Sequence, residues 1–516
     1  MSDNMVHNRT RKVSPFCAAL AAVTAILVFL VAESCTKASQ AKGPVTELRY
    51  GYATEPPVLD PLSSRRTADG AAILFNIYEG LVKPDTEGRI QPCLAETVTV
   101  EEAARVYRFK LREEVRFHNG LPLTSHDVKV SLDTAIAAGL PGLDAIASVE
   151  TDGDFGVQVN LKQPDTEFLP YLTVGIVNAA AMNTGRWAIG TGPYYIESYT
   201  VQQSLVLRKF DDYWREGVPR LETITVMFLA DSASLLLGLQ TGSIDGAGIT
   251  GPLAYQLNPS DFDIVPGYSS MVQLLALNNA VPPLNDIRVR QAINYCIDTQ
   301  GIIDAAFYGW GEPSGSPIIP GLSAYYDQSL ADPYPVDTTL AIRLLAEAGY
   351  SAGGRRLSLE ITVPSDYTMH VDTAQVIVGQ LAKIGIDASI QIVDWDTWLN
   401  SVYRGRNYQA TIISLDSAVV SPRSFLLRYQ SNNSENFINF ASADFDRVFQ
   451  AILAETDEAR RVVLYKQAQR ILSDEAASVY IQDILLFRAL RAGAYGGVLN
   501  YPMSADDFAS MYGNGK

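Results

Sequence analysis

The sequence has 516 residues, of which 47 % are hydrophobic, and a net charge of −17. A chain of this length is expected to form two or three domains rather than a single core. Nucleic acid is not an expected partner, because a protein that binds its phosphates needs a basic surface.

The N-terminal residues show the order of features found in a secretory signal. Arg9, Arg11 and Lys12 precede a nearly continuous apolar run at 16–32, and small residues follow. Residues 1–34 are therefore predicted to be a signal peptide. The apolar run is barely long enough to span a bilayer, so an uncleaved anchor helix is the alternative.

The segment "AESC" ends at Cys35 and resembles a bacterial lipobox, although Ala32 and Glu33 stand where Leu and a small residue are usual. The resemblance implies that Cys35 becomes the lipidated N-terminus and anchors the protein to a membrane. Residues 35–45 would then form a polar tether that holds the folded part away from the lipid. We expect an extracytoplasmic lipoprotein, in the periplasm or at the cell surface.

The first folded elements follow from the spacing of apolar residues. Residues 47–52 are expected to form a strand, and the apolar segment 70–82 a helix that is closed by Gly80. Apolar and charged residues alternate in the first half of 106–117, which predicts a strand with one solvated face.

A capped helix is expected next. Thr124 stands at the N-cap position, and Asp127 can return a hydrogen bond to it. His118 lies in the preceding Asn-Gly turn and His126 in the first helical turn. Their spacing matches no standard metal motif and no third ligand is near in sequence, so no metal is expected.

Helices and strands then continue to alternate. Helices are expected at 286–298 and at 337–350. Another helix should end at Gly385, with a strand directly after it, and a last long amphipathic helix is expected at 459–484. This alternation is typical of an α/β architecture.

Catalytic motifs are missing from the sequence, which has no Walker A loop, G-x-S-x-G, HExxH or C-x-x-C. Only His118, His126 and His370 remain once the signal is removed, so general bases are few. Cys93 and Cys296 are far apart and imply no disulfide framework. The sequence predicts neither an enzyme nor a cofactor.

Five blocks follow one another between about residues 46 and 490: "PPVLDPL" with "NIYEGLV" and "PCLAETV"; "YRFKLREEVRFHNGLPLTSHDVKVSL"; "GTGPYYIESY" with "LRKFDDYW"; "LALNNAVPPLNDIRVRQAINYCID" with "YGWGEPSGSPIIPG"; and "AIRLLAEAGY" with "LAKIGIDASIQIVDWDTWLNSVYRGRNYQATI". In this order they resemble the bacterial extracellular solute-binding proteins of the peptide/nickel type, the secreted receptors of ABC importers.

The resemblance implies an α/β clamshell, a bilobal periplasmic-binding-protein fold (type II-like) with an extra α/β domain. Ligand would be enclosed between the lobes by hinge closure. The hinge is expected at Gly190 and Gly192 of "GTGPYY" and at Leu277, where the chain crosses between lobes. The implied parts are lobe I (46–77, 188–277 and 487–516), lobe II, which is the extra domain (78–187), and lobe III (278–486).

The resemblance also implies a function. A monomer outside the cytoplasm would bind oligopeptides or dipeptides and deliver them to the transmembrane subunits of an ABC permease. In peptide-binding members, main-chain hydrogen bonds hold an extended peptide, and an Asp of lobe III meets its ammonium group. Two alternatives stay open: a non-peptide ligand, such as chelated nickel, haem, an opine or an oligosaccharide, and a secreted hydrolase.

The stretch "ISLDSAVVSPRSFLL" corresponds to the segment that holds the family's Asp. Asp416 lies six residues before Pro422, where four is usual, and Ala418 stands at the usual place. A two-residue insertion would make Asp416 the ammonium site, with Ser417 beside it. A helix cap or a loop-stabilising role is the alternative for Asp416.

Further ligand contacts are expected from two other segments. Arg65 and Arg66, followed by Thr67, lie in a loop that should line the cleft, where adjacent arginines could pair with a ligand carboxylate or phosphate. Solvated surface is the alternative for the arginines. Trp395 is a candidate pocket wall, with a place in the core of lobe III as its alternative.

Overall fold

The computed structural model describes residues 45–515, apart from 66, 102, 183–188, 352, 417–418, 420 and 504. The predicted signal peptide and Cys35 lie outside the described residues, as do Arg66 and Ser417. In the described part of the chain, no helix is both long and apolar enough to cross a lipid bilayer.

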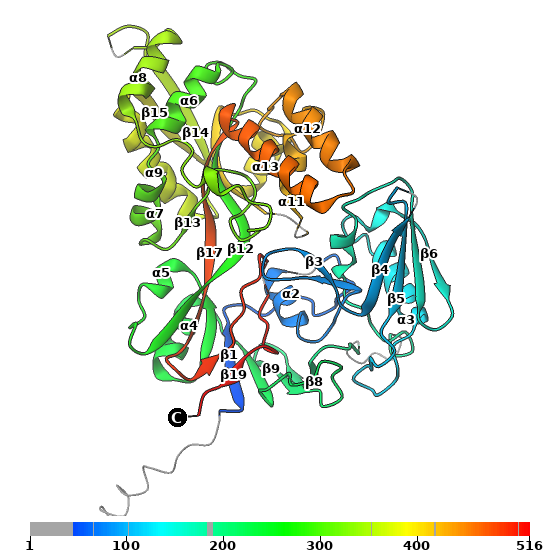
Figure 1. The fold of residues 1–516 in the computed structure, drawn as a ribbon. Helices are drawn as coiled ribbons and strands as arrows, with labels where there is room; N and C mark the ends of the chain where they lie inside the picture. The colour runs from blue at the N-terminus through cyan, green and yellow to red at the C-terminus, as the bar shows by residue number, and fades with distance from the viewer. Residues whose placement is uncertain are drawn as a thin grey trace, which may run out of the picture.

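An 11-stranded sheet runs through the residue ranges that are expected to form lobes I and III (Figure 1). Its strand order is β15-β14-β16-β12-β17-β11-β1-β10-β9-β8, and β13 (Glu312–Pro313) also pairs with β17. Lobe I holds β1 (Glu47–Tyr52), β8 (Tyr194–Thr200), β9 (Ser204–Lys209), β10 (Thr223–Phe228) and β11 (Gly246–Ile249). Lobe III holds β14 (Leu357–Pro364), β15 (Ile386–Val393) and β16 (Ala410–Asp416).

Two long antiparallel strands, β12 (Phe262–Leu277) and β17 (Ser478–Arg491), join these lobes. In Figure 1 they run from lobe I below to lobe III above. Their register shifts between Tyr268 and Val272, and again between Gln273 and Leu274. Because extra residues in one strand of a pair bend it, the shifts mark where this strand pair is bent.

Lobe II has a sheet of its own, in the antiparallel order β4-β5-β7-β6. It comprises β4 (Ala95–Glu101), β5 (Val106–Leu111), β6 (Ile146–Asp152) and β7 (Gly156–Leu161), with α3 (Ser125–Ala137) packed on it and the hairpin of β2 (Val82–Pro84) and β3 (Ile90–Pro92) beside it. Burial alternates along β5 as predicted: Tyr107 and Phe109 are buried, and Arg108 and Lys110 are exposed.

Helices form separate cores in lobe III. On one side lie α6 (Ile287–Cys296), α7 (Thr299–Phe307), α8 (Thr338–Glu347) and α9 (Thr368–Ala382); on the other lie α11 (Pro422–Leu426), α12 (Ala443–Ala454) and α13 (Glu458–Asp474). Leu275 and Leu277 of β12 belong to the first core, whereas Leu274 and Ala276 belong to the second. The sheet therefore separates the two cores, because successive residues of a strand point to opposite faces. Lobe I adds α4 (Ser232–Thr241) and the short α5 (Gly251–Ala254).

Most local predictions are confirmed. The strand at 47–52 is β1, the helices at 286–298 and 337–350 are α6 and α8, and the helix and strand around Gly385 are α9 and β15. The helix after Thr124 is α3, and the Asp127 carboxylate accepts a hydrogen bond from the Thr124 backbone N–H at 3.0 Å.

The helix predicted at 70–82 is wrong in its extent, because α2 (Ala68–Leu74) ends six residues before Gly80. Asn76 follows the helix and binds the returning C-terminal segment. Its amide donates to the Asp506 carbonyl at 2.7 Å, and its side-chain oxygen accepts from the Phe508 backbone N–H at 2.9 Å. These long-range bonds anchor the chain where it leaves the helix.

The helix predicted at 459–484 is wrong in its second half. The helix α13 ends at Asp474, and the chain enters β17 at Ser478. Val479 and Ile481 join the core on one side of the sheet, while Tyr480 joins the core on the other. A strand buried on both faces has an almost continuous apolar sequence, which periodicity alone does not distinguish from a buried helix.

Candidate ligand-binding cleft

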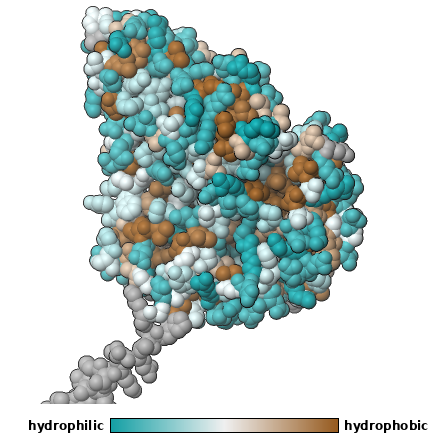
Figure 2. Space-filling model, in the orientation of Figure 1, coloured by the Kyte–Doolittle hydropathy of each residue, from teal (hydrophilic) through white to brown (hydrophobic). Residues whose placement is uncertain are grey.

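A cavity of about 680 Å³ lies where the three lobes meet. This volume is within the usual range for sites that bind small ligands. In Figure 2, apolar residues gather at the junction between lobe III above and lobe II at the right. The cavity wall is rich in apolar and aromatic side chains, which include Phe75, Tyr78, Leu140, Leu143, Tyr171, Val174, Leu499, Tyr501 and Met503.

Asp416 lines this cavity from lobe III. It is the last residue of β16, it is opposite Met271 of β12, and it is exposed. Its backbone carbonyl accepts a hydrogen bond from Arg428 at 2.9 Å, whereas its carboxylate forms no ion pair with any described residue. A carboxylate that is free of a counter-ion at a cavity wall can receive a cation from the ligand. Ser417 follows it but lies outside the described residues.

The loop that holds Arg65 and Thr67 reaches the cavity in part. Thr67 lines the cavity together with Ser63 and Ser64, and its hydroxyl caps α2 by accepting from the Gly70 backbone N–H at 3.2 Å. Arg65 is exposed and is not among the lining residues. The expected contacts of Arg65 and Thr67 with ligand stay predictions.

Trp395, in lobe III, is not among the residues that line the cavity. Its ring stacks on that of Trp398, with centroids 5.1 Å apart and an interplanar angle of 14°. Trp398 is buried, and its indole N–H donates to the Thr411 hydroxyl at 2.9 Å. This packing matches the core position that was the alternative for Trp395.

The "GTGPYY" segment packs tightly against residues 76–78, where the chain passes from lobe I to lobe II. A Cβ on Gly190 or Gly192 would collide with the backbone around Ile77, so only glycine allows this close approach. His118 fixes the same segment. Its backbone N–H donates to the Gly190 carbonyl at 3.0 Å, and its Nε2 lies 2.9 Å from the Gly192 carbonyl. Burial lowers the pKa of His118 to about 4, so this histidine is neutral scaffold.

The irregular part of β12 lies around Ser270 and not at Leu277, the expected hinge residue of this strand. Leu277 ends β12 and is fully buried. Ser270, inside the register shift, has a φ of +60°, and its hydroxyl donates to the Pro502 carbonyl at 2.6 Å. Ser270 and its neighbours Ser269 and Met271 also line the cavity. Hinge roles for Gly190, Gly192 and Leu277 stay predictions.

The sequence did not single out Glu79, a buried carboxylate that joins the cavity wall. It accepts hydrogen bonds from the Tyr213 hydroxyl at 2.8 Å, the Trp214 indole at 2.9 Å and the Thr191 hydroxyl at 3.1 Å. These donors come from the "GTGPYY" and "FDDYW" segments, and Glu79 itself comes from "NIYEGLV". All three segments belong to the blocks of family resemblance, which was the available signal.

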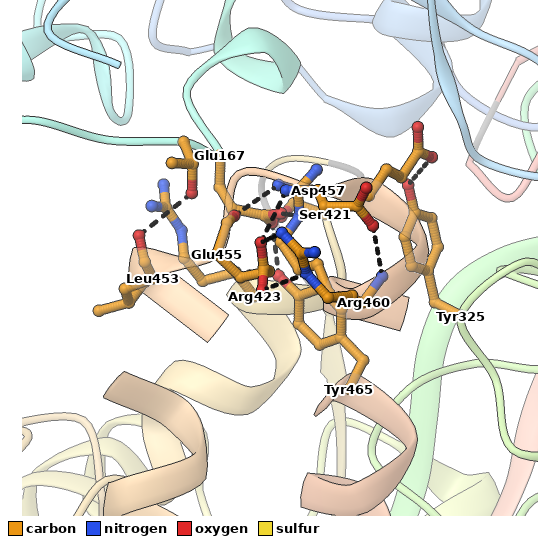
Figure 3. Close-up of polar contacts among 12 residues, drawn as sticks. Glu167, Tyr325, Ser421, Arg423, Leu453, Glu455, Asp457, Arg460 and Tyr465 are labelled. Atoms are coloured by element: carbon orange, nitrogen blue, oxygen red, sulfur yellow. Dashed lines mark hydrogen bonds and ion pairs between the residues drawn. The ribbon is translucent and has the colours of Figure 1, made fainter. Parts of the chain in front are cut away.

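Lobe II also contacts lobe III directly, through a loop before the short helix η2 (Leu169–Thr173). Asp165 pairs with Arg423 at 2.5 Å, and Glu167 pairs with Arg461 at 2.5 Å. Figure 3 shows Glu167 facing Tyr465, whose hydroxyl donates to it at 2.5 Å. We call these five residues the lobe II–III clasp.

The clasp adjoins the cavity. Arg423 donates to the hydroxyl of Tyr171 at 3.2 Å, and Tyr171 lines the cavity. Glu167 and Arg461 are 7 % and 13 % exposed, so their pair is largely shielded from solvent. The clasp therefore ties lobe II to lobe III next to the space that a ligand would occupy.

Asp483 is a fully buried carboxyl in β17, opposite Glu312 of β13. Neither of its oxygens has a hydrogen-bond partner among the described residues. Burial raises the pKa of Asp483 well above its ordinary range, and the charge of Glu312 acts in the same direction. The folded protein therefore holds a proton on Asp483 at pH values where the unfolded chain has lost it.

This shift predicts a pH-dependent effect of Asp483→Asn. The contribution of Asp483 to the free energy of unfolding falls as the pH rises above about 4, the ordinary pKa of an Asp. We therefore expect the variant to be more stable than wild type at pH 8, with an advantage that shrinks toward pH 4. Denaturant unfolding across this range measures it, with the exposed Asp372→Asn as control. A pH-independent difference would contradict the prediction.

Among the described residues, no group of three or more His, Cys, Asp or Glu side chains is arranged to hold a metal ion. Cys93 and Cys296 are both buried free thiols. Burial is the largest influence on both, and it raises the pKa of Cys296 to about 11.

Comparison with known proteins identifies the family to which this chain is similar. Residues 89–437 match the family model of bacterial extracellular solute-binding proteins, family 5 middle. Glutathione-binding protein GsiB of Shigella dysenteriae serotype 1 is 28 % identical over 489 residues, which cover 89 % of this chain and 91 % of that protein.

Solved structures show the same fold. MppA, a periplasmic murein tripeptide binding protein in an unliganded open form, has a TM-score of 0.81 at 21 % identity and covers 91 % of this chain and 98 % of its own. DppA of Helicobacter pylori in complex with peptide STSA has a TM-score of 0.69 at 22 % identity, with 92 % and 99 % covered. The predicted bilobal α/β fold is confirmed. The family match spans more than half of the sequence, so this chain belongs to the bacterial extracellular solute-binding proteins of family 5.

Proposed function

We propose that this solute-binding protein, the substrate-binding component of an ABC importer, takes a short peptide between its lobes and passes it to the transmembrane subunits of the permease. The observation that carries the proposal is the 680 Å³ cavity with the unpaired Asp416 at its lobe III wall. The names of GsiB, MppA and the DppA complex, which refer to glutathione, a tripeptide and a peptide, support it.

The proposed mechanism is binding by lobe closure, without chemical change to the ligand. The bent pair β12 and β17 would flex at its register shift and bring Asp416 toward the lobe I and lobe II walls. The lobes that move would have the limits expected from the sequence.

Titration of tryptophan fluorescence with trialanine, maltotriose and a nickel–histidine complex tests the ligand class. We expect saturable binding of trialanine alone, together with a smaller radius of gyration in small-angle X-ray scattering. Chromatography of the released ligand should recover trialanine intact. Binding of only the sugar or only the nickel complex would overturn the peptide proposal, and cleavage of trialanine would overturn the absence of catalysis.

We also propose that Cys35 carries the lipid anchor and that the mature protein is a monomer outside the cytoplasm. The basic N-terminal residues, the apolar run and "AESC" support the anchor. Cells that are given a fatty-acid probe should label the wild-type protein and leave Cys35→Ala unlabelled. Labelling of the variant would contradict the anchor, and a dimer in sedimentation velocity would contradict the monomer.

A further inference from the structure

Two cationic side chains line the cavity from lobes other than lobe III. Lys83 comes from β2 of lobe II, and Arg215 comes from the loop that follows β9 in lobe I. Both are half-buried. Trp214, the neighbour of Arg215, donates to Glu79 at 2.9 Å, and the Cys93 thiol lies 3.6 Å from the other Glu79 carboxylate oxygen. Cys93 directly follows β3, the strand that pairs with Lys83 and the rest of β2. Both cations therefore lie near the part of the wall around Glu79.

Neither cation is neutralised by a direct partner. In the described part of the chain, Lys83 and Arg215 form no ion pair and donate no hydrogen bond. Arg215 instead lies over the ring of Trp214, with 4.6 Å from its guanidinium carbon to the ring centroid. Stacking of this kind orients the guanidinium and leaves its N–H groups free to bind.

The carboxylates of this wall are already occupied. Glu79 accepts from Tyr213, Trp214 and Thr191, as described above. Asp507 accepts from the Tyr501 hydroxyl at 2.9 Å and from the Ser510 backbone N–H at 3.2 Å. No described carboxylate pairs with Arg215, so an incoming ligand carboxylate can form two parallel charge-assisted bonds with its guanidinium.

We infer that Arg215, assisted by Lys83, is the residue that binds a carboxylate of the ligand and so restricts this receptor to peptides with a free acid group. The inference rests on the proposed function. Asp416 contributes the opposite charge from lobe III, so the ligand is a zwitterion that spans the cavity from its ammonium to its carboxylate. The carboxylate belongs either to the C-terminus or to an acidic side chain, and the ligands below distinguish the two.

Calorimetric titration of four probes tests the inference: trialanine, its C-terminal amide, Ala-Glu-Ala amide and succinate. The wild type should bind trialanine about 10-fold or more tighter than its amide. Recovery of binding by Ala-Glu-Ala amide would assign a side-chain carboxylate, and its failure a C-terminal one. In Arg215→Met with Lys83→Met, the preference for the acid should disappear. Arg220→Met, which removes an exposed arginine over Tyr512 outside the cavity, should keep it.

The other outcomes separate the two proposals. If trialanine and its amide bind the wild type equally and Ala-Glu-Ala amide binds no tighter, the carboxylate site is wrong and the peptide ligand stands. If no peptide binds but succinate binds the wild type and not the double variant, the peptide ligand is wrong and the carboxylate site stands. If none of the four binds, both are wrong. Matched circular dichroism spectra and melting temperatures confirm that each variant is folded.

Discussion

Glu167→Gln is expected to lower the free energy of unfolding by about 3 kcal/mol, because it leaves a shielded Arg461 without its counter-charge. Arg461 is 13 % exposed, and Tyr465 loses the charged acceptor of its hydroxyl at the same time. Since this contact joins lobe II to lobe III, we also expect a larger radius of gyration without ligand. Denaturant unfolding and small-angle X-ray scattering measure the two effects.

A double variant makes this prediction specific. Adding Arg461→Met to Glu167→Gln removes the stranded charge and should recover most of the lost stability. Arg447→Met breaks the solvent-exposed pair with Asp444, whose side chains are 72 % and 65 % exposed, and should cost less than about 1 kcal/mol. Strictly additive losses in the double variant would show that the two residues are not coupled, contrary to the prediction.

Asp416→Asn is expected to weaken the binding of trialanine by at least about 2 kcal/mol, which is roughly 30-fold in Kd. When the lobes close on a peptide, the variant would leave the ligand's ammonium group without its counter-charge. The fold should be unaffected, because Asp416 is exposed and substitutions of exposed residues usually change stability little. Calorimetry measures the affinity, and thermal melting checks the fold.

Two controls define the role of Asp416. N-acetyl-trialanine lacks the ammonium, so it should bind the wild type poorly and respond little to the variant. Asp387→Asn removes an exposed carboxylate of β15 outside the cavity and should leave trialanine binding unchanged. Equal binding of acetylated and free peptide by the wild type would mean that no ammonium site exists here.

The binding residues illustrate what local sequence leaves undetermined. The cavity wall draws on residues from Pro61 to Ser510, and its members are brought together by three lobes. Family resemblance pointed to Asp416 and Thr67, both of which reach the cavity. Arg215 gave no signal of its own in "FDDYWREGVP", because a charged residue in a loop looks the same whether it faces solvent or a cavity.

The sequence by itself determined the elements whose pattern is local. The alternation in β5, the cap of α3 and the apolar face of α6 each follow from neighbouring residues, and the structure has all three. The blocks of resemblance determined the family and its fold in the same way, because their order is a property of the chain alone.

Only the tertiary structure decided where α2 stops and that 478–484 form a strand. Just after α2 ends, the side chain of Asn76 is bound by the C-terminal segment, 430 residues away. The apolar run in β17 forms a strand because β12 pairs with it and a hydrophobic core covers each of its faces. Backbone pairing and burial on both faces depend on partners distant in sequence, so no local period specifies them.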